Sequence, residues 1–472
     1  MLEEVVKRML SQERGAVEAP AGAGKTEQIA VAVSQLPGRW LVLTHTVAGV
    51  EALRRRLGKH GVTDSRAHVD TISAWAYRWA RAYPLGSGFP AEWSAKSNDW
   101  EVVHRAATTL VSSGAVASVL AASYAGAFVD EYQDCTSSQH ALMLALADIM
   151  RCYVFGDPLQ AIFGFDKGER LVDWQSTTLA NFPLAGRLET PHRWQKAKNE
   201  ALGAWLLALR PNIKEGNIDL SSAPACVRWT PCNKGVQLRD LARMCAVQGK
   251  KSEETLVVLD ASERAVRRAD LAKQLGGTTI EPVSGKCERA FYAKLSVTNG
   301  MSRAEAVLEF ASTVFVGIDS SVKKKRIASI LQRPGRQKTA PSTAELALCT
   351  VAESNDYSNV LSAIDCLAND PKTKVVRPEL LFSVKAALRA VVDDPSMSLD
   401  DAAWQIATLK RLRGRVVRDQ SVGSTLLVKG LEFDHVVITP EACNSPYEWY
   451  VALTRATKSI RVLAPSQNFT VT

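Results

Sequence analysis

Two short segments in the first third of the chain contain the residue types that handle a nucleoside triphosphate. Residues 19–26 read Ala-Pro-Ala-Gly-Ala-Gly-Lys-Thr, and residues 127–134 read Ala-Phe-Val-Asp-Glu-Tyr-Gln-Asp. Glycines followed by a lysine and a hydroxyl let backbone N–H groups surround phosphate oxygens at the start of a helix. Two adjacent carboxylates at the end of an apolar strand suit a magnesium ion and an attacking water molecule. Together the segments predict a site that binds and hydrolyses a nucleoside triphosphate.

The first segment predicts the phosphate contacts. Lys25 is placed to neutralise the β and γ phosphates, and Thr26 offers its hydroxyl to magnesium at the first turn of a helix reaching about Ser34. The segment begins with Ala19, where the common phosphate-loop pattern has glycine. A flexible turn is the alternative, but the lysine and threonine between a predicted strand and helix favour phosphate binding. The predicted nucleotide-binding residues of this loop are Ala21, Gly22, Ala23, Gly24, Lys25 and Thr26.

The second segment predicts the metal ligand and the catalytic carboxylate. Thr26 and Asp130 are expected to hold Mg²⁺, Asp130 through water, while Glu131 polarises the hydrolytic water. Gln133 is placed to respond to the γ-phosphate, and Asp134 to brace neighbouring loops. The alternative is a solvated acidic turn. The phosphate loop earlier in the chain favours the catalytic interpretation.

Short apolar runs that alternate with helical patterns predict the elements that position these residues. Such runs indicate buried parallel strands, whose carboxyl ends carry functional polar residues in open α/β sheets. The first set comprises residues 39–44, 127–130 and 152–156, and the second comprises residues 255–260, 435–439 and 460–463. Two sheets of this kind predict an α/β protein with two cores. Residues 282–407 and 71–124 instead read as helical insertions.

Composition restricts the class of protein. A chain of 472 residues is expected to form roughly three or four domains of ~100–200 residues each. The N-terminal segment lacks the pattern of a secretory or transit signal, and the longest apolar stretch is too short to span a membrane. Nine scattered cysteines predict reduced thiols. We therefore expect a cytoplasmic protein without a membrane partner.

The charge balance favours a polyanionic partner. The formal net charge is +9, and basic residues cluster at 323–326 and 410–418. Either cluster has the chemistry to follow phosphates, and for each the alternative is a solvated helix face or loop.

The order of motifs along the chain resembles superfamily 1 helicases of the UvrD/Rep/PcrA type. After the two segments above come Phe-Gly-Asp-Pro-Leu-Gln at 155–160, Leu-Glu-Thr-Pro-His-Arg at 188–193, Lys-Gly-Leu-Glu-Phe at 429–433 and Tyr-Val-Ala-Leu-Thr-Arg-Ala at 450–456. In that family two RecA-like domains clamp ATP and move on single-stranded DNA, generally 3′ to 5′. The resemblance implies an α/β fold of two RecA-like parallel-sheet domains with helical insertions. The implied division is 1–70 and 125–185 for the first RecA-like domain, 71–124 for a small helical insertion, 186–281 and 408–472 for the second RecA-like domain, and 282–407 for a helical insertion domain.

The same resemblance implies further site residues. Gln160 would sense the γ-phosphate, and Arg193 and Arg455 would reach in from the second domain to stabilise transition-state charge. Glu432 would accept a hydrogen bond from the ribose, and Gly430 would allow a close backbone approach. For each arginine the alternative is a surface ion pair.

The DNA-facing residues implied by the family agree less well with its usual pattern. His45 stands where the family usually has phenylalanine, and Leu426 and Ser73 stand where histidines are usual. Stacking of bases on aromatic rings is the expected chemistry, with core packing as the alternative for each ring. Because these departures from the family pattern lie on the DNA-facing side, the sequence favours ATP hydrolysis more strongly than processive unwinding. The predicted DNA-binding residues are Thr44, His45, Thr71, Phe163 and Phe165.

Two functional hypotheses follow from the sequence. The first is an ATP-dependent DNA translocase or helicase that acts on single-stranded or partly duplex DNA in repair or anti-phage defence. The second is an ATP-switched regulatory subunit of a nuclease-containing complex, because the compact helicase subunits of the Gabija system resemble this chain in layout. An RNA helicase is a weaker third possibility. Stimulation of ATP hydrolysis by DNA, set against stable association with a nuclease, distinguishes the first two.

Overall fold

The fold is known from a computed structural model that describes residues 1–471 apart from 95–98, 163–169, 248–249, 281–285 and 414–418, and apart from the side chains of 408 and 410–413. The chain divides into two compact units. The first contains residues 1–227, 444–459 and 466–472, and the second contains residues 228–443 and 460–465. Each unit is described by itself.

A six-stranded sheet forms the centre of the first unit. Its strand order is β3-β2-β4-β5-β1-β6, and every neighbouring pair is parallel. The strands are β1 (Arg14–Glu18), β2 (Trp40–Thr44), β3 (Ala67–Thr71), β4 (Gly126–Val129), β5 (Arg151–Gly156) and β6 (Leu184–Arg187). All five residues of β2 are buried, as a central strand covered on both faces requires. Because the strands are parallel, the loops after β1, β4 and β5 leave from one edge.

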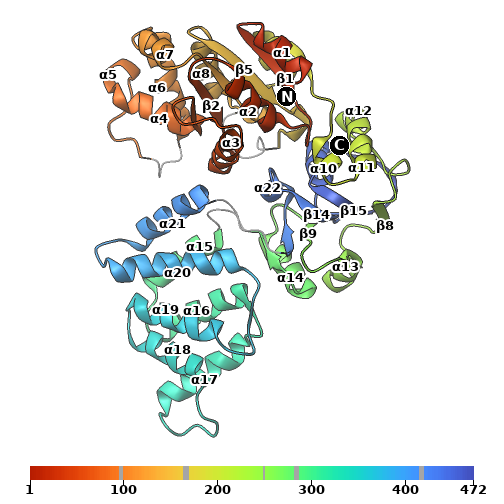
Figure 1. Cartoon of the computed structure of the whole chain (residues 1–472). Helices are drawn as coiled ribbons and strands as arrows, with labels where there is room; N and C mark the ends of the chain where they lie inside the picture. Colours follow the sequence, from red (N-terminus) through yellow and green to blue (C-terminus); the bar gives the residue numbers. More distant parts are fainter. Residues whose placement is uncertain (95–98, 163–169, 248–249, 281–285, 414–418, 472) are drawn as a thin grey trace. The chain divides into compact units, whose positions relative to one another are not determined.

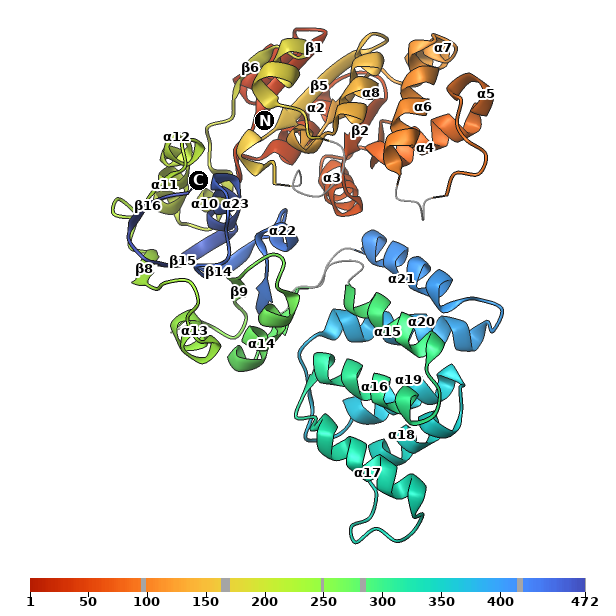
Figure 2. The ribbon, with the colours of Figure 1, turned by 180° about the vertical axis from the view of Figure 1, so that it is seen from behind.

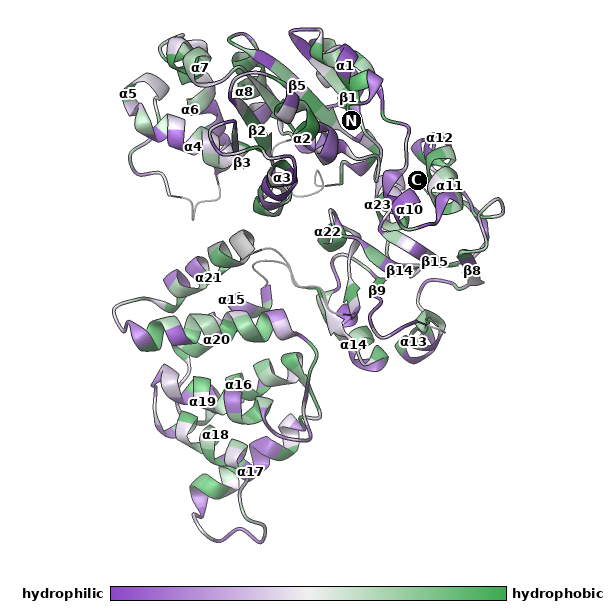
Figure 3. Cartoon of the chain, in the orientation of Figure 1, coloured by the Kyte–Doolittle hydropathy of each residue, from purple (hydrophilic) through white to green (hydrophobic). Residues whose placement is uncertain are grey.

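Helices cover both faces of this sheet, as Figures 1 and 2 show from opposite sides. Alternate strand residues face opposite ways: Trp40 and Val42 pack with α1, α2 and α3, whereas Leu41 and Leu43 pack with α4, α6, α7 and α8. Figure 3 shows the resulting concentration of hydrophobic residues in the strands. The helices of the two layers are α1 (Glu4–Leu10), α2 (Lys25–Gln35), α3 (Val47–Lys59), α4 (Ile72–Ala82), α6 (Trp100–Ser112), α7 (Ala117–Ser123) and α8 (Ser137–Ala147).

Shorter elements complete the first unit. They are α5 (Pro84–Ser87), η2 (Tyr132–Asp134), η3 (Pro158–Gln160), η4 (Trp174–Thr178), α9 (Leu179–Asn181), α10 (His192–Lys196), α11 (Glu200–Ala208), α12 (Arg210–Lys214), α23 (Pro446–Leu453), and the antiparallel pair β7 (Asn217–Asp219) and β16 (Asn468–Thr470). Of these, α10, α12 and α23 come from segments far from the phosphate loop in sequence, and all three contribute side chains beside it.

The second unit has its own six-stranded sheet, in the order β10-β13-β9-β14-β15-β8. The pairs β10 with β13, β13 with β9, and β9 with β14 run parallel. Apolar residues of α13 and α14 pack against this sheet. Its elements are β8 (Val227–Pro231), α13 (Leu238–Cys245), β9 (Leu256–Leu259), α14 (Ala265–Leu275), β10 (Thr278–Thr279), β13 (Gln420–Gly423), α22 (Thr425–Val428), β14 (Phe433–Ile438) and β15 (Ala456–Ala464).

A helical region with its own apolar core lies between β10 and β13 in the sequence. It consists of α15 (Lys286–Val297), α16 (Gly300–Val314), α17 (Ser320–Gln332), α18 (Thr343–Glu353), α19 (Tyr357–Ala368), α20 (Pro378–Asp393) and α21 (Leu399–Arg413). A short antiparallel pair, β11 (Phe315–Val316) with β12 (Lys374–Val375), joins two of its loops. The capping box of Ser342 and Glu345 defines the start of α18.

The predicted fold class is confirmed: the protein is α/β, with two six-stranded sheets and helical insertions. The apolar runs predicted as strands from the sequence all form strands. The compact unit that contains the phosphate loop also includes residues 186–227 and 444–459, which the sequence analysis assigned to the second domain. The division into four parts stays a prediction. Among the described residues, no single helix is long and apolar enough to cross a membrane, and only the bent pair α6 and α7 passes by length and composition.

Removal of one large ring from the first sheet is expected to destabilise the first unit strongly. Phe128 is fully buried, and its ring centroid lies 4.9 Å from that of Trp40 and 5.4 Å from that of Tyr153. Phe128→Ala should lower the free energy of unfolding by about 3–5 kcal/mol, because it opens a cavity. Urea denaturation measures this loss. Leu85→Ala, at a fully exposed position, is the control and should change stability by less than about 0.5 kcal/mol; equal midpoints for the two variants would refute the prediction.

Candidate functional site

The phosphate loop connects the carboxyl end of β1 to the first turn of α2. Gly22 and Gly24 adopt positive φ angles of 72° and 80°, which glycine tolerates and other residues rarely do. The helix begins at Lys25 after Gly24 in the left-handed conformation, and no described side chain caps it. Its first N–H groups are therefore available to an anion, which the helix dipole also favours.

Helix α10 packs directly against this loop. The backbone N–H of Arg193 donates to the carbonyl of Gly22 at 3.1 Å. A Cβ atom on Gly22 would lie 2.7 Å from the ring of Trp194 and 2.9 Å from the Cβ of Arg193. Gly22 is thus required both by its backbone angle and by the closeness of α10. The contact places Arg193 beside the phosphate loop within one compact unit.

Lys25 pairs with both adjacent carboxylates. Its Nζ lies 2.7 Å from Oε2 of Glu131 and 3.7 Å from Oδ1 of Asp130. Burial pulls the pKa of Lys25 down, but the charges of Glu131 and Asp130 outweigh burial and hold that pKa above its usual value. The lysine therefore stays charged, and its partners occupy the position where a phosphate would compete for it.

Asp130 and Thr26 form the second half of this cluster. The Thr26 hydroxyl donates to Oδ2 of Asp130 at 3.2 Å. Burial raises the pKa of Asp130 to about 6, against the opposing effect of the Lys25 charge. A buried carboxylate beside a hydroxyl supplies the hard oxygen ligands that Mg²⁺ prefers. The donor set fits that ion.

Glu131 has an unusual backbone. Its φ angle is 58°, in the left-handed region that is uncommon outside glycine. The Oδ1 atom of Asp130 accepts from the Glu131 backbone N–H at 2.9 Å, and Oε2 of Glu131 accepts from Nε2 of Gln133 at 2.7 Å. Strained backbone of this kind persists only where surrounding contacts hold it, and it clusters at functional sites. The turn directs the Glu131 carboxylate toward Lys25.

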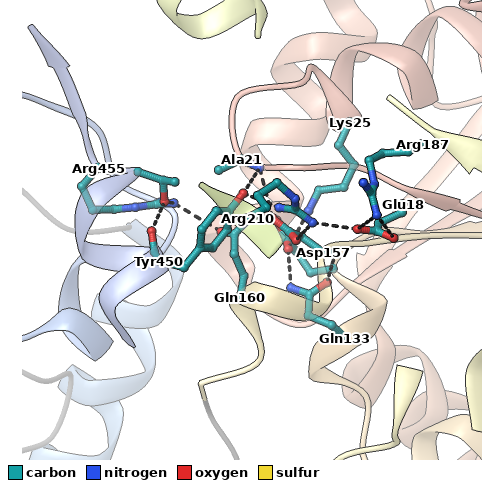
Figure 4. A network of polar contacts seen from close by, with 12 residues as sticks. Glu18, Ala21, Lys25, Gln133, Asp157, Gln160, Arg187, Arg210, Tyr450 and Arg455 are labelled. Carbon is teal, nitrogen blue, oxygen red and sulfur yellow. Dashed lines mark hydrogen bonds and ion pairs between the residues drawn. The ribbon is translucent and has the colours of Figure 1, made fainter. Parts of the chain in front are cut away.

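Gln133 and Asp157 connect this turn to the loop after β5, as Figure 4 shows. Oε1 of Gln133 accepts from the backbone N–H of Asp157 at 2.9 Å. Oδ2 of Asp157 accepts from the Ala21 N–H at 3.1 Å and from Nε2 of Gln160 at 2.8 Å. The fully buried Asp157 thus binds the phosphate loop and Gln160 with the same oxygen.

Arg455, just after α23, and Arg193, on α10, both approach the site. Nη2 of the buried Arg455 donates to Oε1 of Gln160 at 3.3 Å and to the Thr454 hydroxyl at 2.9 Å. Nη1 of Arg193 donates to the Thr454 carbonyl at 2.6 Å. The structure therefore brings together Lys25, Asp130, Glu131, Gln133, Gln160, Arg193 and Arg455 in one unit.

The sequence analysis assigned no site role to four buried members of this network. They are Arg210, Glu18, Asp157 and Tyr450, and the first two form an ion pair of 2.7 Å. The Tyr450 hydroxyl accepts from the Ala21 N–H at 3.2 Å. The only local signal for Arg210 is an arginine between Leu209 and Pro211 at the end of an apolar run.

The predicted DNA-binding residues fall into two groups. Thr44 and Thr71 pair in register at the carboxyl ends of β2 and β3, and His45 follows Thr44 with its Nε2 atom 3.6 Å from Sγ of Cys135. Phe163 and Phe165 lie outside the described residues. Thr44 is only 2% exposed.

Gly430 and Glu432 belong to the second unit. Gly430 has a φ angle of 81° and lies with Glu432 between α22 and β14. The positive φ explains the glycine there. Their predicted contact with the nucleotide stays a prediction.

Comparison with known proteins supports the resemblance stated above. Residues 96–171 match the family model described as the UvrD/REP helicase N-terminal domain, which confirms the resemblance over the segment that includes Asp130, Glu131 and Gln160. No curated protein sequence matches the chain. The chain is similar in structure to the Pif1 helicase from Candida albicans, with 13% identity and a TM-score of 0.41 over 99% of this chain and 96% of that one.

Two structures of the Arterivirus helicase, nonstructural protein 10, are also similar. The protein alone shows 11% identity and a TM-score of 0.36 over 98% of this chain and 62% of that one. Its complex with DNA shows 10% identity and a TM-score of 0.36 over 98% of this chain and 63% of that one. This chain therefore spans less than two thirds of the Arterivirus chains it matches.

The raised pKa of Asp130 predicts a pH-dependent cost to stability. The pKa of the Asp130 carboxyl is raised to about 6 in the folded protein. At a pH below the ordinary pKa of aspartate this group therefore contributes its full share to the free energy of unfolding, and that share is lost as the pH rises through about 6. Asp130→Asn removes the dependence. In buffer without Mg²⁺ or nucleotide, its unfolding free energy should exceed that of the wild type by about 1–3 kcal/mol at pH 8 and match it near pH 4.

Urea denaturation across this pH range provides the measurement. Asp148→Asn is the control, because the Asp148 side chain is 71% exposed in its pair with Arg14 and surface pairs contribute little. Parallel stability curves for Asp130→Asn and the wild type from pH 4 to pH 8 would show that Asp130 carries no such cost.

Proposed function

We propose that this protein is an ATP hydrolase that moves on single-stranded DNA, a superfamily 1 translocase or helicase of the UvrD-like type with 3′ to 5′ polarity. One observation carries the proposal. A continuous polar network joins the phosphate loop, the Asp130 and Glu131 carboxylates, Gln160 and Arg455 within a single compact unit. The family match over residues 96–171 adds support.

ATP binding begins with an exchange of partners at Lys25. Its ammonium leaves Glu131 and Asp130 for the β and γ phosphates, while N–H groups of the phosphate loop and of α2 receive phosphate oxygens. Thr26 and Asp130 would hold Mg²⁺, which would stabilise negative charge on the phosphate oxygens. The exchange frees the Glu131 carboxylate, 35% exposed in its side chain, to orient and deprotonate the attacking water.

Gln160 and the two arginines complete the proposed chemistry. Gln160 contacts the γ-phosphate, and its amide oxygen already accepts from Arg455. Arg455 and Arg193 supply positive charge where negative charge develops in the transition state. In related phosphoryl-transfer enzymes such arginines contribute ~10³–10⁵ in rate. Loss of the γ-phosphate then changes the partners of Gln160 and Arg455 together. We propose that rearrangement of Gln160 and Arg455 couples hydrolysis to movement.

The edge formed by β2 and β3 is the proposed DNA-facing surface. Thr44, His45 and Thr71 lie at the carboxyl ends of these strands, and polar groups there suit the phosphodiester backbone of a single strand. The net charge of +9 favours such a partner. Cytoplasmic DNA in repair or in defence against phage is the proposed setting, and a nuclease partner is the alternative that the second prediction below tests.

Separate loss of binding and of hydrolysis is expected from two substitutions. Lys25→Ala should abolish hydrolysis and weaken ATP binding, because the phosphates lose their buried cation. Glu131→Gln should reduce kcat at least ~10³-fold and leave ATP affinity within about threefold of wild type. Steady-state phosphate release and binding of a fluorescent ATP analogue measure the two effects. Glu101→Gln, in the exposed pair with Arg105, is the control, and normal turnover by Glu131→Gln would remove Glu131 from its catalytic role.

Single-stranded DNA should stimulate hydrolysis by the purified chain. We expect at least about tenfold stimulation, with a matched duplex lacking single-stranded ends much less effective, and displacement of a strand annealed beside a 3′ single-stranded tail. The same duplex with a 5′ tail is the polarity control. If the rate of ATP hydrolysis does not change with DNA and the chain copurifies stoichiometrically with a nuclease, these results would instead support the regulatory-subunit hypothesis.

A further inference from the structure

Arg210 connects three side chains around the phosphate loop although it lies on α12, far from the loop in sequence. Its Nη2 atom lies 2.7 Å from Oε1 of Glu18 and 2.9 Å from Oδ1 of Asp157. Its Nη1 atom donates to the Tyr450 hydroxyl, and the guanidinium lies 5.0 Å from the centre of the Tyr450 ring. The Arg210 side chain is 6% exposed, and those of Glu18 and Asp157 are 7% and 0% exposed. Figure 4 shows this convergence.

Arg210 is the buried cation that these two carboxylates share. Glu18 ends β1 and Asp157 follows β5, so the parallel sheet brings both to the same edge. Two buried carboxylates that share one nitrogen would repel each other strongly without it. Burial alone would lower the pKa of Arg210, but the charges of Asp157 and Glu18 raise it. A guanidinium suits this site because it stays charged and offers several donors in one plane.

Two partners of Arg210, Asp157 and Tyr450, in turn contact the phosphate loop. The Ala21 N–H, inside the phosphate loop, donates both to Asp157 at 3.1 Å and to Tyr450 at 3.2 Å. The same Asp157 oxygen accepts from Gln160 at 2.8 Å. Arg210 therefore fixes, through two intermediaries, where the phosphate loop and Gln160 lie relative to each other.

We propose that Arg210 is a positioning residue. Through Asp157 and Tyr450 it holds the first half of the phosphate loop and Gln160 in fixed positions relative to each other. The proposal rests on the proposed ATP hydrolysis for its kinetic consequences, but its structural consequence, an ordered Ala21 amide, is independent of that activity. Arg210 has no assigned role toward the phosphates or the attacking water in the proposed function. It acts through Asp157 and Tyr450.

Arg187 provides a matched control for the experiment. Its Nη2 atom also pairs with Glu18, at 3.1 Å, but its side chain is 51% exposed, and no contact of Arg187 with Asp157 or Tyr450 is found among the described residues. Arg187→Met therefore removes an arginine from the same carboxylate and leaves the positions of the phosphate loop and Gln160 unchanged. Arg210→Met is the test variant. Arg210→Lys retains the charge without the planar fork, and it becomes the measured variant should Arg210→Met fail to fold.

Hydrogen exchange and kinetics test the proposal separately. In nucleotide-free protein, peptides covering residues 19–26 should exchange at least about tenfold faster in Arg210→Met than in Arg187→Met, while β2 and β4 exchange at equal rates. The kcat for ATP should fall about 100-fold in Arg210→Met, as expected when catalytic groups shift by about 1 Å, with a smaller rise in KM. Compared with Arg210→Met, Arg210→Lys should recover thermal stability more fully than it recovers kcat. A merely structural role would not produce this difference.

The outcomes separate this proposal from the proposed function. Faster hydrogen exchange of the phosphate loop in Arg210→Met supports the positioning role even if the wild type hydrolyses no ATP. Absence of ATP hydrolysis by the wild type would contradict the proposed function. Wild-type kcat and loop exchange in folded Arg210→Met or Arg210→Lys would overturn the positioning role and leave hydrolysis untouched. Exchange that accelerates equally in the loop, β2 and β4 would also overturn it, because Arg210 would then serve global stability alone.

Discussion

Buried opposite charge at one edge of a parallel sheet is the constraint on which the first unit depends. The loops after β1, β4 and β5 all leave that edge, and they carry Lys25, Asp130 and Asp157 into an interior that disfavours isolated ions. Each carboxylate there has a cation: Lys25 pairs with Glu131 and Asp130, and Arg210 pairs with Glu18 and Asp157. Such pairs add little net stability, but removal of the cation is costly because it leaves buried carboxylates without a counter-charge. A triphosphate can displace carboxylates from Lys25 because it brings its own negative charge.

The two charge clusters have different exposure, and this difference suggests different roles. Glu131 is 35% exposed in its side chain, so the Lys25 cluster opens toward solvent and a ligand. Asp157 is fully buried, so the Arg210 cluster is closed to ligands and suits a fixed support. Asp157 links them, since it accepts from Ala21 in the phosphate loop and from Gln160. Under the proposed function, the open cluster exchanges partners during each hydrolytic cycle while the closed cluster keeps the geometry constant.

Local patterns predicted the fold class and the residues of the phosphate loop and of the carboxylate turn. Glycine spacing followed by lysine and threonine reflects a local backbone conformation that the sequence pattern shows directly, and the strands were visible as apolar runs. Arg210 and Tyr450 could not be found in this way, because their role arises from α12 and α23 packing beside a loop that is distant in sequence. The motif resemblance implied that Arg193 and Arg455 act at the phosphate loop, but it assigned them to the second domain. Their place in the same compact unit as the loop follows from tertiary contacts such as that of Arg193 with Gly22. The positive φ of Glu131 also depends on its surroundings.

The central claim is that this edge of the sheet is a nucleotide site in which Lys25 changes partners. A crystal structure of the chain with a non-hydrolysable ATP analogue and Mg²⁺ tests it most directly. We expect the Lys25 ammonium to have left Glu131 for the β and γ phosphates, with Mg²⁺ beside Thr26 and Asp130 and the contacts of Asp157 with Ala21 and Arg210 unchanged. An analogue bound elsewhere, with the pair of Lys25 and Glu131 still at 2.7 Å, would contradict the account.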